Sequence, residues 1–395
     1  MIHRDYLIVG AGTSAFHACQ ALRQYDPKGS VMLIGDDYLP PLETPKMDKA
    51  WFKEPKPDYS SLTVAPEDWF SQNRIDYRPG TLVTQFNIER RLAVLQTGQS
   101  IEFKKALLAT GSRPKRPQIA GFNLGNIIYP RTIHDIFAIR EIASHEKGCA
   151  VIGSDLHALR YAAALRSSNH NVILLSGDKF LLEGLVDPAT GQFLNEYALA
   201  HGLKLTLEEN LNGFEGKTVL KNVQLKSGTR FAAGMAVVSL GSEPDLRLVQ
   251  GTPLSSPNGS PVNEYLETDE KGIYSVGPLA LFPDKLFGSV RRWDYPSCAL
   301  LQGQTAGANI TGRKRQKFDY LPHFGLDFFD LKLRFVGDFS KPILRTLLDG
   351  AYDKKKFTVS ILSGEKIVAA ILCNRSPETE ETVTQQIRSG FKPSP

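Results

Sequence analysis

One short segment near the start of the chain constrains the fold more than any other. An apolar run, Tyr6-Leu7-Ile8-Val9, stops at Gly10-Ala11-Gly12-Thr13-Ser14-Ala15, and a helix-like stretch follows to Leu22. A buried strand that passes through a glycine turn into a helix is the first half of a Rossmann unit. In that motif Gly10 makes the turn, Gly12 lets the backbone approach a diphosphate, and Ala15 allows close helix packing. The segment predicts a dinucleotide-binding α/β domain.

A second apolar strand completes this unit. It covers Val31 to Ile34 and ends at Gly35-Asp36. Asp36 therefore stands where a carboxylate can accept both hydroxyls of an adenosine ribose. The NH groups of the first helical turn, at Thr13 and Ser14, are expected to face phosphate, because a helix N-terminus attracts anions. A glycine turn without a ligand stays open as the alternative.

The same pattern recurs later in the chain. The strand Cys149 to Ile152 runs into Gly153-Ser154-Asp155, then into a helix-like stretch from Leu156 to Arg166 and a further strand, Val172 to Leu175. Each copy is also followed by an apolar strand that ends at glycine, Leu107 to Gly111 in the first and Val237 to Gly241 in the second. An internal duplication of the dinucleotide-binding unit follows from this repetition.

The last part of the chain has a different pattern. Strands are expected at 331–336, 357–362 and 366–373, and a polar helix at 377–389. The predicted fold class is α/β, with two Rossmann-like dinucleotide-binding domains and a small α+β C-terminal domain. The predicted boundaries are 1–116 with 243–316 for the first domain, 117–242 for the second, and 317–395 for the third.

Composition excludes several classes of function. The formal charge is +5, from 47 basic and 42 acidic residues in 395, which is too dilute to indicate nucleic acid binding. The four cysteines lie far apart, so neither a disulfide framework nor a metal site is predicted. The sequence contains no apolar run long enough for a membrane span and no pattern typical of a signal peptide. A cytoplasmic location is expected.

The order of these motifs resembles the flavoproteins with two dinucleotide-binding domains, the pyridine nucleotide-disulfide oxidoreductase superfamily. Within it the chain is similar to apoptosis-inducing factor and to the ferredoxin and rubredoxin reductases, and the similarity includes the tail segment Phe329 to Leu333. The resemblance implies that the first unit binds FAD and the second a nicotinamide dinucleotide. It also implies electron transfer to a ferredoxin-like protein, a quinone or another acceptor.

The resemblance assigns residues to both cofactors. Lys49 matches the family lysine beside the flavin and is the predicted catalytic residue, and Val83 is placed near the adenine. The positions expected to contact FAD are Gly10, Gly12, Thr13, Ser14, Ala15, Asp36, Lys49, Val83, Ala109, Thr110, Gly111, Arg131, Gly277 and Asp294. The positions expected to contact NAD(P)H are Gly153, Asp178, Gly241 and Glu243.

The sequence departs from the family pattern at both cofactors. Thr44 stands where relatives have arginine, Pro278 where they have an aspartate that contacts the ribityl chain, and the tail lacks two family tryptophans. Asp155 replaces the second glycine of the nicotinamide motif. At about 4 Å and an effective dielectric constant near 20, two like charges repel by about 4 kcal/mol, so Asp155 disfavours a diphosphate in the usual pose. Arg160 is predicted to pair with Asp155 or with a phosphate.

Three functions are consistent with these residues. The first is an FAD-dependent NAD(P)H oxidoreductase. The second is a degenerate relative that serves as a binding or assembly module with weak or no nicotinamide turnover. The third is a flavoprotein reduced by a protein partner. No cysteine pair follows the first helix, which excludes a disulfide-reductase mechanism. The choice between NADH and NADPH, and whether the chain forms a homodimer, stay open, and Arg291-Arg292 is interpreted as a solvated face or an anion contact.

Overall fold

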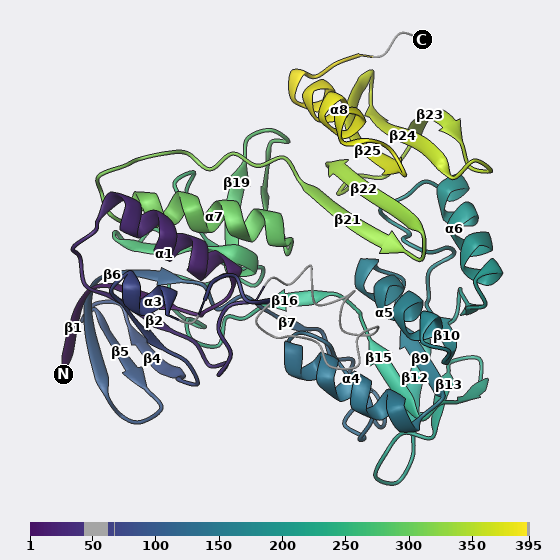
Figure 1. Ribbon diagram of the computed structural model, residues 1–395, viewed down its shortest axis with the longest axis horizontal. Helices are drawn as coiled ribbons and strands as arrows, with labels where there is room; N and C mark the ends of the chain where they lie inside the picture. Colours follow the sequence, from purple (N-terminus) through teal and green to yellow (C-terminus); the bar gives the residue numbers. More distant parts are fainter. Residues whose placement is uncertain (43–61, 67, 393–395) are drawn as a thin grey trace. The chain divides into compact units, whose positions relative to one another are not determined.

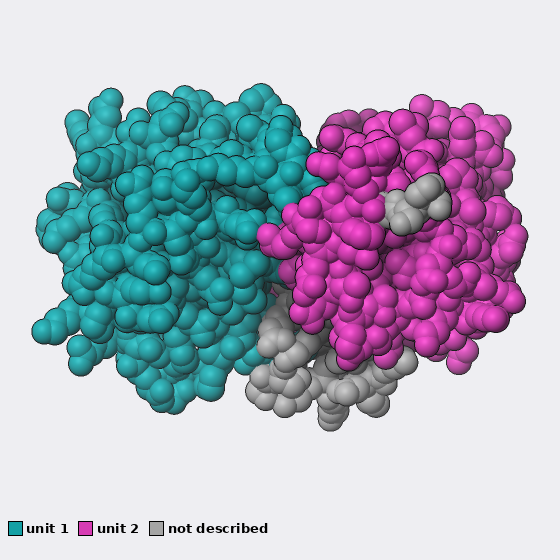
Figure 2. All heavy atoms as spheres, turned by 90° about the horizontal axis from the view of Figure 1, so that it is seen from above, with its two compact units in different colours: residues 1–46, 58–113, 242–320 teal, residues 47–57, 114–241, 321–395 magenta. Residues whose placement is uncertain are grey.

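The computed structural model describes residues 1–42, 62–66 and 68–392. These residues divide into two compact units (Figure 2). The first unit consists of 1–42, 62–66, 68–113 and 242–320, and the second of 114–241 and 321–392. The domain boundaries expected from the sequence stay predictions.

Within its described residues, the first unit contains a seven-stranded sheet in the order β3-β2-β1-β6-β5-β4, with β18 paired to β6 (Figure 1). The strands β1, β2, β3, β6 and β18 run parallel, whereas β4 and β5 form an antiparallel extension. Their bounds are β1 Ile2–Val9, β2 Val31–Ile34, β3 Ile75–Arg78, β4 Val83–Asn87, β5 Leu92–Leu95, β6 Ser100–Leu108 and β18 Ile273–Ser275. The remaining elements of the unit are α1 Thr13–Tyr25, α3 Trp69–Gln72, β17 Ser260–Pro261, the 3₁₀ helix η2 Gly277–Leu279, β19 Ala280–Asp284, β20 Ser289–Arg291 and α7 Pro296–Asn309.

Helices α1 and α7 lie against each other in this unit (Figure 1). The face of α1 is made by residues at helical spacing, such as Ala15, Cys19 and Leu22, which are fully buried. On α7, a Cβ added at Gly303 would lie 2.2 Å from the carbonyl oxygen of Ser14, and glycine at this position lets the two helix backbones touch. The predicted close packing of the first helix therefore depends on glycine in a second helix far along the chain.

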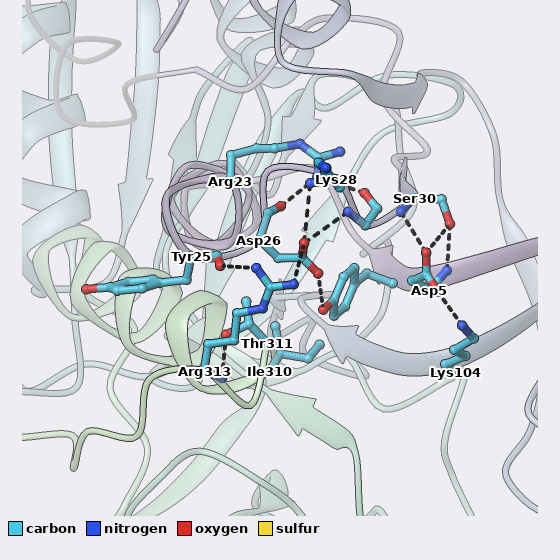
Figure 3. A network of polar contacts seen from close by, with 12 residues as sticks. Asp5, Arg23, Tyr25, Asp26, Lys28, Ser30, Lys104, Ile310, Thr311 and Arg313 are labelled. Carbon is cyan, nitrogen blue, oxygen red and sulfur yellow. Dashed lines mark hydrogen bonds and ion pairs between the residues drawn. The ribbon is translucent and has the colours of Figure 1, made fainter.

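A polar network ties the end of α1 to β1 and to the connector after α7 (Figure 3). Asp26, the residue after α1, is 7% exposed and accepts hydrogen bonds from the Tyr6 hydroxyl at 2.8 Å and the Gly29 NH at 3.1 Å. The oxygen that accepts the Gly29 NH also faces the Arg313 guanidinium at 3.3 Å. Burial alone would raise the pKa of Asp26, but these donors and the arginine charge hold that pKa below its usual value. The network fixes where the first Rossmann helix ends.

The second unit repeats the Rossmann pattern. Among its described residues, a five-stranded parallel sheet has the order β11-β10-β9-β15-β8. Its strands are β8 Ile127–Ile128, β9 Gly148–Ile152, β10 Asn171–Leu175, β11 Lys204–Thr206 and β15 Met235–Val238, and its helices are α4 Ile133–His145, α5 Leu156–Ser167 and α6 Pro188–Ala200. A small antiparallel sheet is formed by β12 Leu211–Glu215, β13 Asn222–Leu225 and β14 Arg230–Ala232. Strands β7 Ser112–Pro114 and β16 Ser242–Pro244 pair as a two-stranded ribbon, in which β16 and the first two residues of β7 belong to the first unit.

The C-terminal part of this unit is an antiparallel sheet in the order β21-β22-β25-β24-β23 with one helix against it. The bounds are β21 His323–Phe328, β22 Leu331–Gly337, β23 Arg345–Ala351, β24 Lys356–Ser363, β25 Lys366–Cys373 and α8 Pro377–Ser389. Helix α8 has the predicted bounds and begins with proline, which suits a first helical position because its missing NH would be unpaired there. The predicted α/β fold class with an α+β tail is confirmed. No helix in the described residues is long and apolar enough to cross a membrane.

Candidate cofactor sites

The first glycine of the N-terminal motif is required by the fold itself. Gly10 has a φ of +101°, and a Cβ added there would lie 2.1 Å from the carbonyl oxygen of Ala109. Its NH donates to the Ile34 carbonyl at 2.8 Å, and the Ala109 NH donates to the Val9 carbonyl at 2.7 Å. The turn after β1 is thus pressed between the ends of β2 and β6, which leaves room only for glycine.

Gly12 differs from Gly10 because nothing in the described structure requires it. Gly12 is the N-cap of α1 with an ordinary φ of −84°, and a Cβ added there would meet no atom within 4 Å. No side chain caps the helix, and its first turn contains no acidic residue. A helix N-terminus with free NH groups and a positive dipole end attracts anions. These features fit the diphosphate of FAD. Thr13 and Ser14, in the first turn of α1, are the residues whose NH groups would face it.

A buried amide lies next to this turn. The NH of Gly277 donates to Oε1 of Gln302 at 2.6 Å, and a Cβ at Gly277 would lie 2.9 Å from Oγ of Ser14. Gln302 is fully buried on α7, and its Nε2 has no hydrogen-bond partner among the described residues. An unpaired buried donor costs about 1–3 kcal/mol, so a bound group that accepts from it would be stabilised. Sequence reasoning missed Gln302, although a glutamine among the small residues of that helix was a visible signal.

The residue after Gly277 is a proline, which offers no carboxylate to a cofactor. Pro278 occupies an early position of η2, a 3₁₀ helix of three residues, and is buried. Pro278 therefore belongs to a single short helical turn. The aspartate of the family pattern is lost there, while the neighbouring Gln302 offers a polar group from another helix.

Two further positions predicted to contact FAD are Asp36, which lies shortly after β2, and Val83, which begins β4. A Cβ at Gly35 would lie 2.5 Å from the Cβ of Ala11, so the end of β2, where Asp36 follows, lies directly beside the glycine turn. Asp36 is exposed, which leaves its carboxylate accessible to a ribose. Val83 is 6% exposed and belongs to the apolar core of the first unit, in the same cluster as Leu7 and Leu108. The structure brings Asp36 close to the motif, but Val83 has an ordinary core position.

Asp294 holds the connecting strands of the first unit. One of its carboxylate oxygens accepts hydrogen bonds from Oγ of Ser112 and Oγ of Ser242, each at 2.6 Å. Thr110 donates its hydroxyl to the Asp245 carbonyl at 2.8 Å, next to Ala109 and Gly111 at the end of β6. Asp294 is thus a structural anchor in this unit.

Other predicted positions fall in different surroundings. Glu243 lies in the first unit, where it forms an ion pair with Arg113 at 3.1 Å. Lys49, the predicted catalytic residue, and Thr44, which departs from the family pattern, lie outside the described residues. The interpretation of Arg291 as a solvated face is wrong: it is 8% exposed, lies 3.5 Å from the Asp284 carboxylate, and has its guanidinium over the Trp293 ring.

The second unit has the same first glycine. Gly153 has a φ of +118°, and a Cβ there would lie 1.9 Å from the carbonyl oxygen of Ser239. Its NH donates to the Leu175 carbonyl at 2.8 Å. The turn after β9 is therefore built like the turn after β1, as the internal repetition predicts.

The N-terminus of α5 is filled by the protein's own carboxylate. Asp155 is the N-cap, and its side chain accepts the Ala158 NH at 2.8 Å. The hydroxyl of Ser239 lies within hydrogen-bond distance of both carboxylate oxygens, at 2.8 and 2.9 Å. A diphosphate in the usual pose would meet this negative charge, so the residues at α5 do not fit it. The predicted partner Arg160 instead donates to the Gly325 carbonyl on β21.

The remaining nicotinamide positions are also engaged or peripheral. The carboxylate of Asp178 accepts hydrogen bonds from the hydroxyls of Ser154 and of Ser176, the latter at 2.8 Å. Gly241, with a φ of +85°, lies in the turn that follows β15. Arg131, which is instead expected to contact FAD, is exposed before α4, and its NH donates at 2.9 Å to Asp135, which belongs to the capping box of that helix.

The cysteines offer no redox pair. All four are free and buried. Burial raises the pKa of Cys19 and of Cys373 to about 12 and that of Cys149 to about 11, and it raises the pKa of Cys298 as well. A thiolate is needed for disulfide chemistry. The thiols of this chain are thus apolar core groups.

Comparison with known proteins is consistent with this geometry. Putidaredoxin reductase of Pseudomonas putida is 28% identical over 384 residues, which cover 96% of this chain and 90% of that protein. Monodehydroascorbate reductase of Pisum sativum is 25% identical over 413 residues, covering 98% and 95%. Rubredoxin-NAD(+) reductase of Pseudomonas putida is 26% identical over 307 residues, covering 78% and 80%.

Solved structures give the same result. A ferredoxin reductase from Rhodopseudomonas palustris superposes with a TM-score of 0.93 at 23% identity, covering 99% of this chain and 96% of that one. A chain of the covalent putidaredoxin reductase–putidaredoxin complex superposes with a TM-score of 0.92 at 27% identity, covering 99% and 94%. The predicted relationship to ferredoxin and rubredoxin reductases is confirmed.

A family model described as pyridine nucleotide-disulphide oxidoreductase matches residues 4–302. The match spans both Rossmann motifs and the strand ends at Gly111, Gly241 and Gly277. The family implies FAD and a nicotinamide dinucleotide as ligands, and the two helix N-termini differ in how well they suit such groups. The chain belongs to the pyridine nucleotide-disulphide oxidoreductase family.

Proposed function

We propose that this chain is an FAD-dependent oxidoreductase that takes electrons from a reduced nicotinamide and passes them to a small electron-transfer protein. The observation that carries the FAD part is the open N-terminus of α1, where a Cβ at Gly12 would meet no atom of the described residues within 4 Å. A fold that needed this glycine for its own packing would place atoms there, as it does at Gly10. The open space favours a ligand that approaches the backbone.

In this proposal each residue of the first unit has a defined role. The NH groups of Thr13 and Ser14 bind phosphate oxygens, and Asp36 accepts ribose hydroxyls beside the same turn. Gln302 donates its Nε2, which has no partner among the described residues, to the cofactor, in place of the contact that relatives make with the aspartate lost at Pro278. Lys49 is proposed to lie near the flavin.

When bound, the flavin supplies two-electron chemistry: its oxidised form takes up two electrons and two protons, and two one-electron acceptors each remove one electron. The acceptor proposed here is an iron–sulfur protein of the ferredoxin class. Its support is the similarity over nearly the full chain to putidaredoxin reductase, whose structure in a covalent complex with putidaredoxin superposes closely. A quinone is the alternative acceptor, because it also accepts electrons from reduced flavins.

A spectroscopic experiment tests this function. The purified protein, loaded with FAD, is expected to show flavin absorption bands that bleach when NADH or NADPH is added without oxygen, and that return when oxidised ferredoxin is added. A Gln302→Leu variant should bind FAD at least tenfold more weakly, because it removes the donor at similar volume. A protein that takes up no FAD would refute the proposal and favour the degenerate binding module. Flavin bands that persist with both nicotinamides would favour reduction by a protein partner.

A further inference from the structure

The two Rossmann units differ at the N-cap of the helix that follows the glycine turn. In the first unit the N-cap of α1 is Gly12, and space beyond its backbone is open. In the second unit the N-cap of α5 is Asp155, and its side chain accepts the Ala158 NH of the first helical turn. In a Rossmann unit that binds a dinucleotide, a bound phosphate can satisfy such NH groups. In α5 a carboxylate of the protein itself accepts one of them.

A second strand fixes this carboxylate. The hydroxyl of Ser239, directly after β15, lies 2.8 and 2.9 Å from the two oxygens of Asp155. The carbonyl of the same Ser239 lies where a side chain at Gly153 would stand. Asp155 also has an extended backbone, with φ −74° and ψ 176°, which is ordinary for an N-cap. We call Asp155, Ser239 and the Ala158 NH the α5 clasp. It is an unstrained arrangement, and it closes the end of the helix.

A second observation concerns the other half of an adenosine site. Asp178 follows β10, where a family carboxylate accepts ribose hydroxyls, but here it already accepts the hydroxyls of Ser154 and Ser176. Ser154 and Ser176 are both buried, at 5% and 9% exposure. Both hydroxyls donate to the same oxygen of Asp178, so a ribose would have to share this carboxylate with two serines. Both groups that would recognise adenosine diphosphate thus already accept hydrogen bonds from the protein.

We propose that Asp155 is a specificity-determining residue that removes recognition of the adenosine diphosphate half of a dinucleotide. The electron donor is then recognised by its nicotinamide half alone, so reduced nicotinamide mononucleotide serves as well as NADH. The inference rests on the proposed function for its donor, but its central claim concerns binding. The proposed loss of adenosine diphosphate recognition distinguishes this chain from relatives that have glycine at position 155.

Binding of ADP-ribose tests the claim without turnover. ADP-ribose carries the diphosphate and the adenosine but no nicotinamide, and its affinity for the FAD-loaded protein is measured by calorimetry. We expect Asp155→Gly to bind ADP-ribose at least tenfold more tightly than the wild type, since removal of a like charge at contact is worth between tenfold and a thousandfold. Asp187→Gly is the matched control, because Asp187 is the N-cap of α6 and accepts the Ala189 and Thr190 NH groups. It should bind like the wild type.

A conservative variant protects the test against misfolding. Asp155→Asn keeps an acceptor for the Ala158 NH while it removes the charge, and we expect it to bind ADP-ribose more tightly than the wild type as well. Equal ADP-ribose affinity in the wild type, Asp155→Gly and Asp155→Asn would overturn the inference. So would tighter binding in the Asp187 control, because the gain would then not belong to α5.

A kinetic measurement links the clasp to the donor. The rate of anaerobic flavin reduction is compared for NADH and reduced nicotinamide mononucleotide at several concentrations. We expect the ratio of their second-order rate constants to be within about threefold of one in the wild type, and to favour NADH at least tenfold in Asp155→Gly. A wild type that prefers NADH by more than tenfold would overturn the inference. A protein without bound FAD would refute the proposed function instead, and the inference would then be decided by the change in ADP-ribose affinity that Asp155→Gly causes in the flavin-free protein.

Discussion

Gly10 and Gly12 stand two residues apart in one turn, yet replacing each by alanine should have opposite consequences. Gly10 has a φ of +101° and lies against the Ala109 carbonyl, where a Cβ would be 2.1 Å from oxygen. Gly12 has a φ of −84° and faces open space. We therefore expect Gly10→Ala to damage the fold and Gly12→Ala to damage FAD binding.

The structure gives the size of each effect. A side chain at the φ of Gly10 costs on the order of 1–3 kcal/mol, and forcing the turn away from β6 adds about 1–3 kcal/mol. The total of about 2–6 kcal/mol is a large part of the roughly 5–15 kcal/mol that stabilises a domain. At Gly12, alanine replaces glycine at an N-cap, which costs about 0.5–1 kcal/mol. A methyl group between the backbone and a phosphate should weaken FAD binding at least tenfold, or by about 1.4 kcal/mol.

Two measurements on each variant separate these effects. Urea unfolding of flavin-free protein gives the free energy of unfolding, and titration with FAD gives the dissociation constant. Gly12→Ala should have a free energy of unfolding close to that of the wild type and a weaker affinity for FAD. If Gly12→Ala bound FAD as tightly as the wild type, no diphosphate would lie at the N-terminus of α1. If Gly10→Ala were as stable as the wild type, the contact with Ala109 would not constrain the turn.

Two further predictions concern stability and thiol reactivity. Asp26→Ala should lower the free energy of unfolding by about 2–4 kcal/mol, because the buried Tyr6 hydroxyl and the Gly29 NH lose their acceptor. Because the folded pKa of Asp26 is lowered, its contribution is present above the unfolded pKa of about 3.9 and is lost as pH falls through the folded value, so variant and wild type should converge in urea unfolding at low pH. A thiol reagent at pH 7.5 should label none of the cysteines in the folded protein and all of them in urea, since burial raises the pKa of Cys19 to about 12. Mass spectrometry that finds one cysteine labelled rapidly in the folded protein would contradict this.

Local patterns predicted the elements well. The polar helix at 377–389 begins and ends where the sequence places it, because a proline marks its start and Gly390, with a φ of +67°, follows its end. The glycine turns at Gly10 and Gly153 also follow from spacing alone. Such features depend on a few neighbouring residues, and the physical cause of each is local.

Long-range partners were not predictable in the same way. Gln302 meets Gly277 only because α7 packs on η2, and the clasp joins Asp155 to a serine 84 residues later. The sequence predicted a repulsive carboxylate at Asp155 but not that the protein itself would satisfy it. The sequence left open whether Arg291 is a solvated face or an anion contact, and tertiary packing buries it beside Asp284.

The sequence by itself determined the two Rossmann units, the tail domain and the family, because strand, turn and helix patterns are written in the order of residues. Only the tertiary structure decided which groups hold each glycine turn and each helix N-terminus in place. That choice depends on groups brought together from distant strands, in particular Ser239 beside Asp155 and the Ala109 carbonyl beside Gly10. Hydrogen bonds between such groups form only after the sheet has folded, and their geometry is not encoded in local spacing.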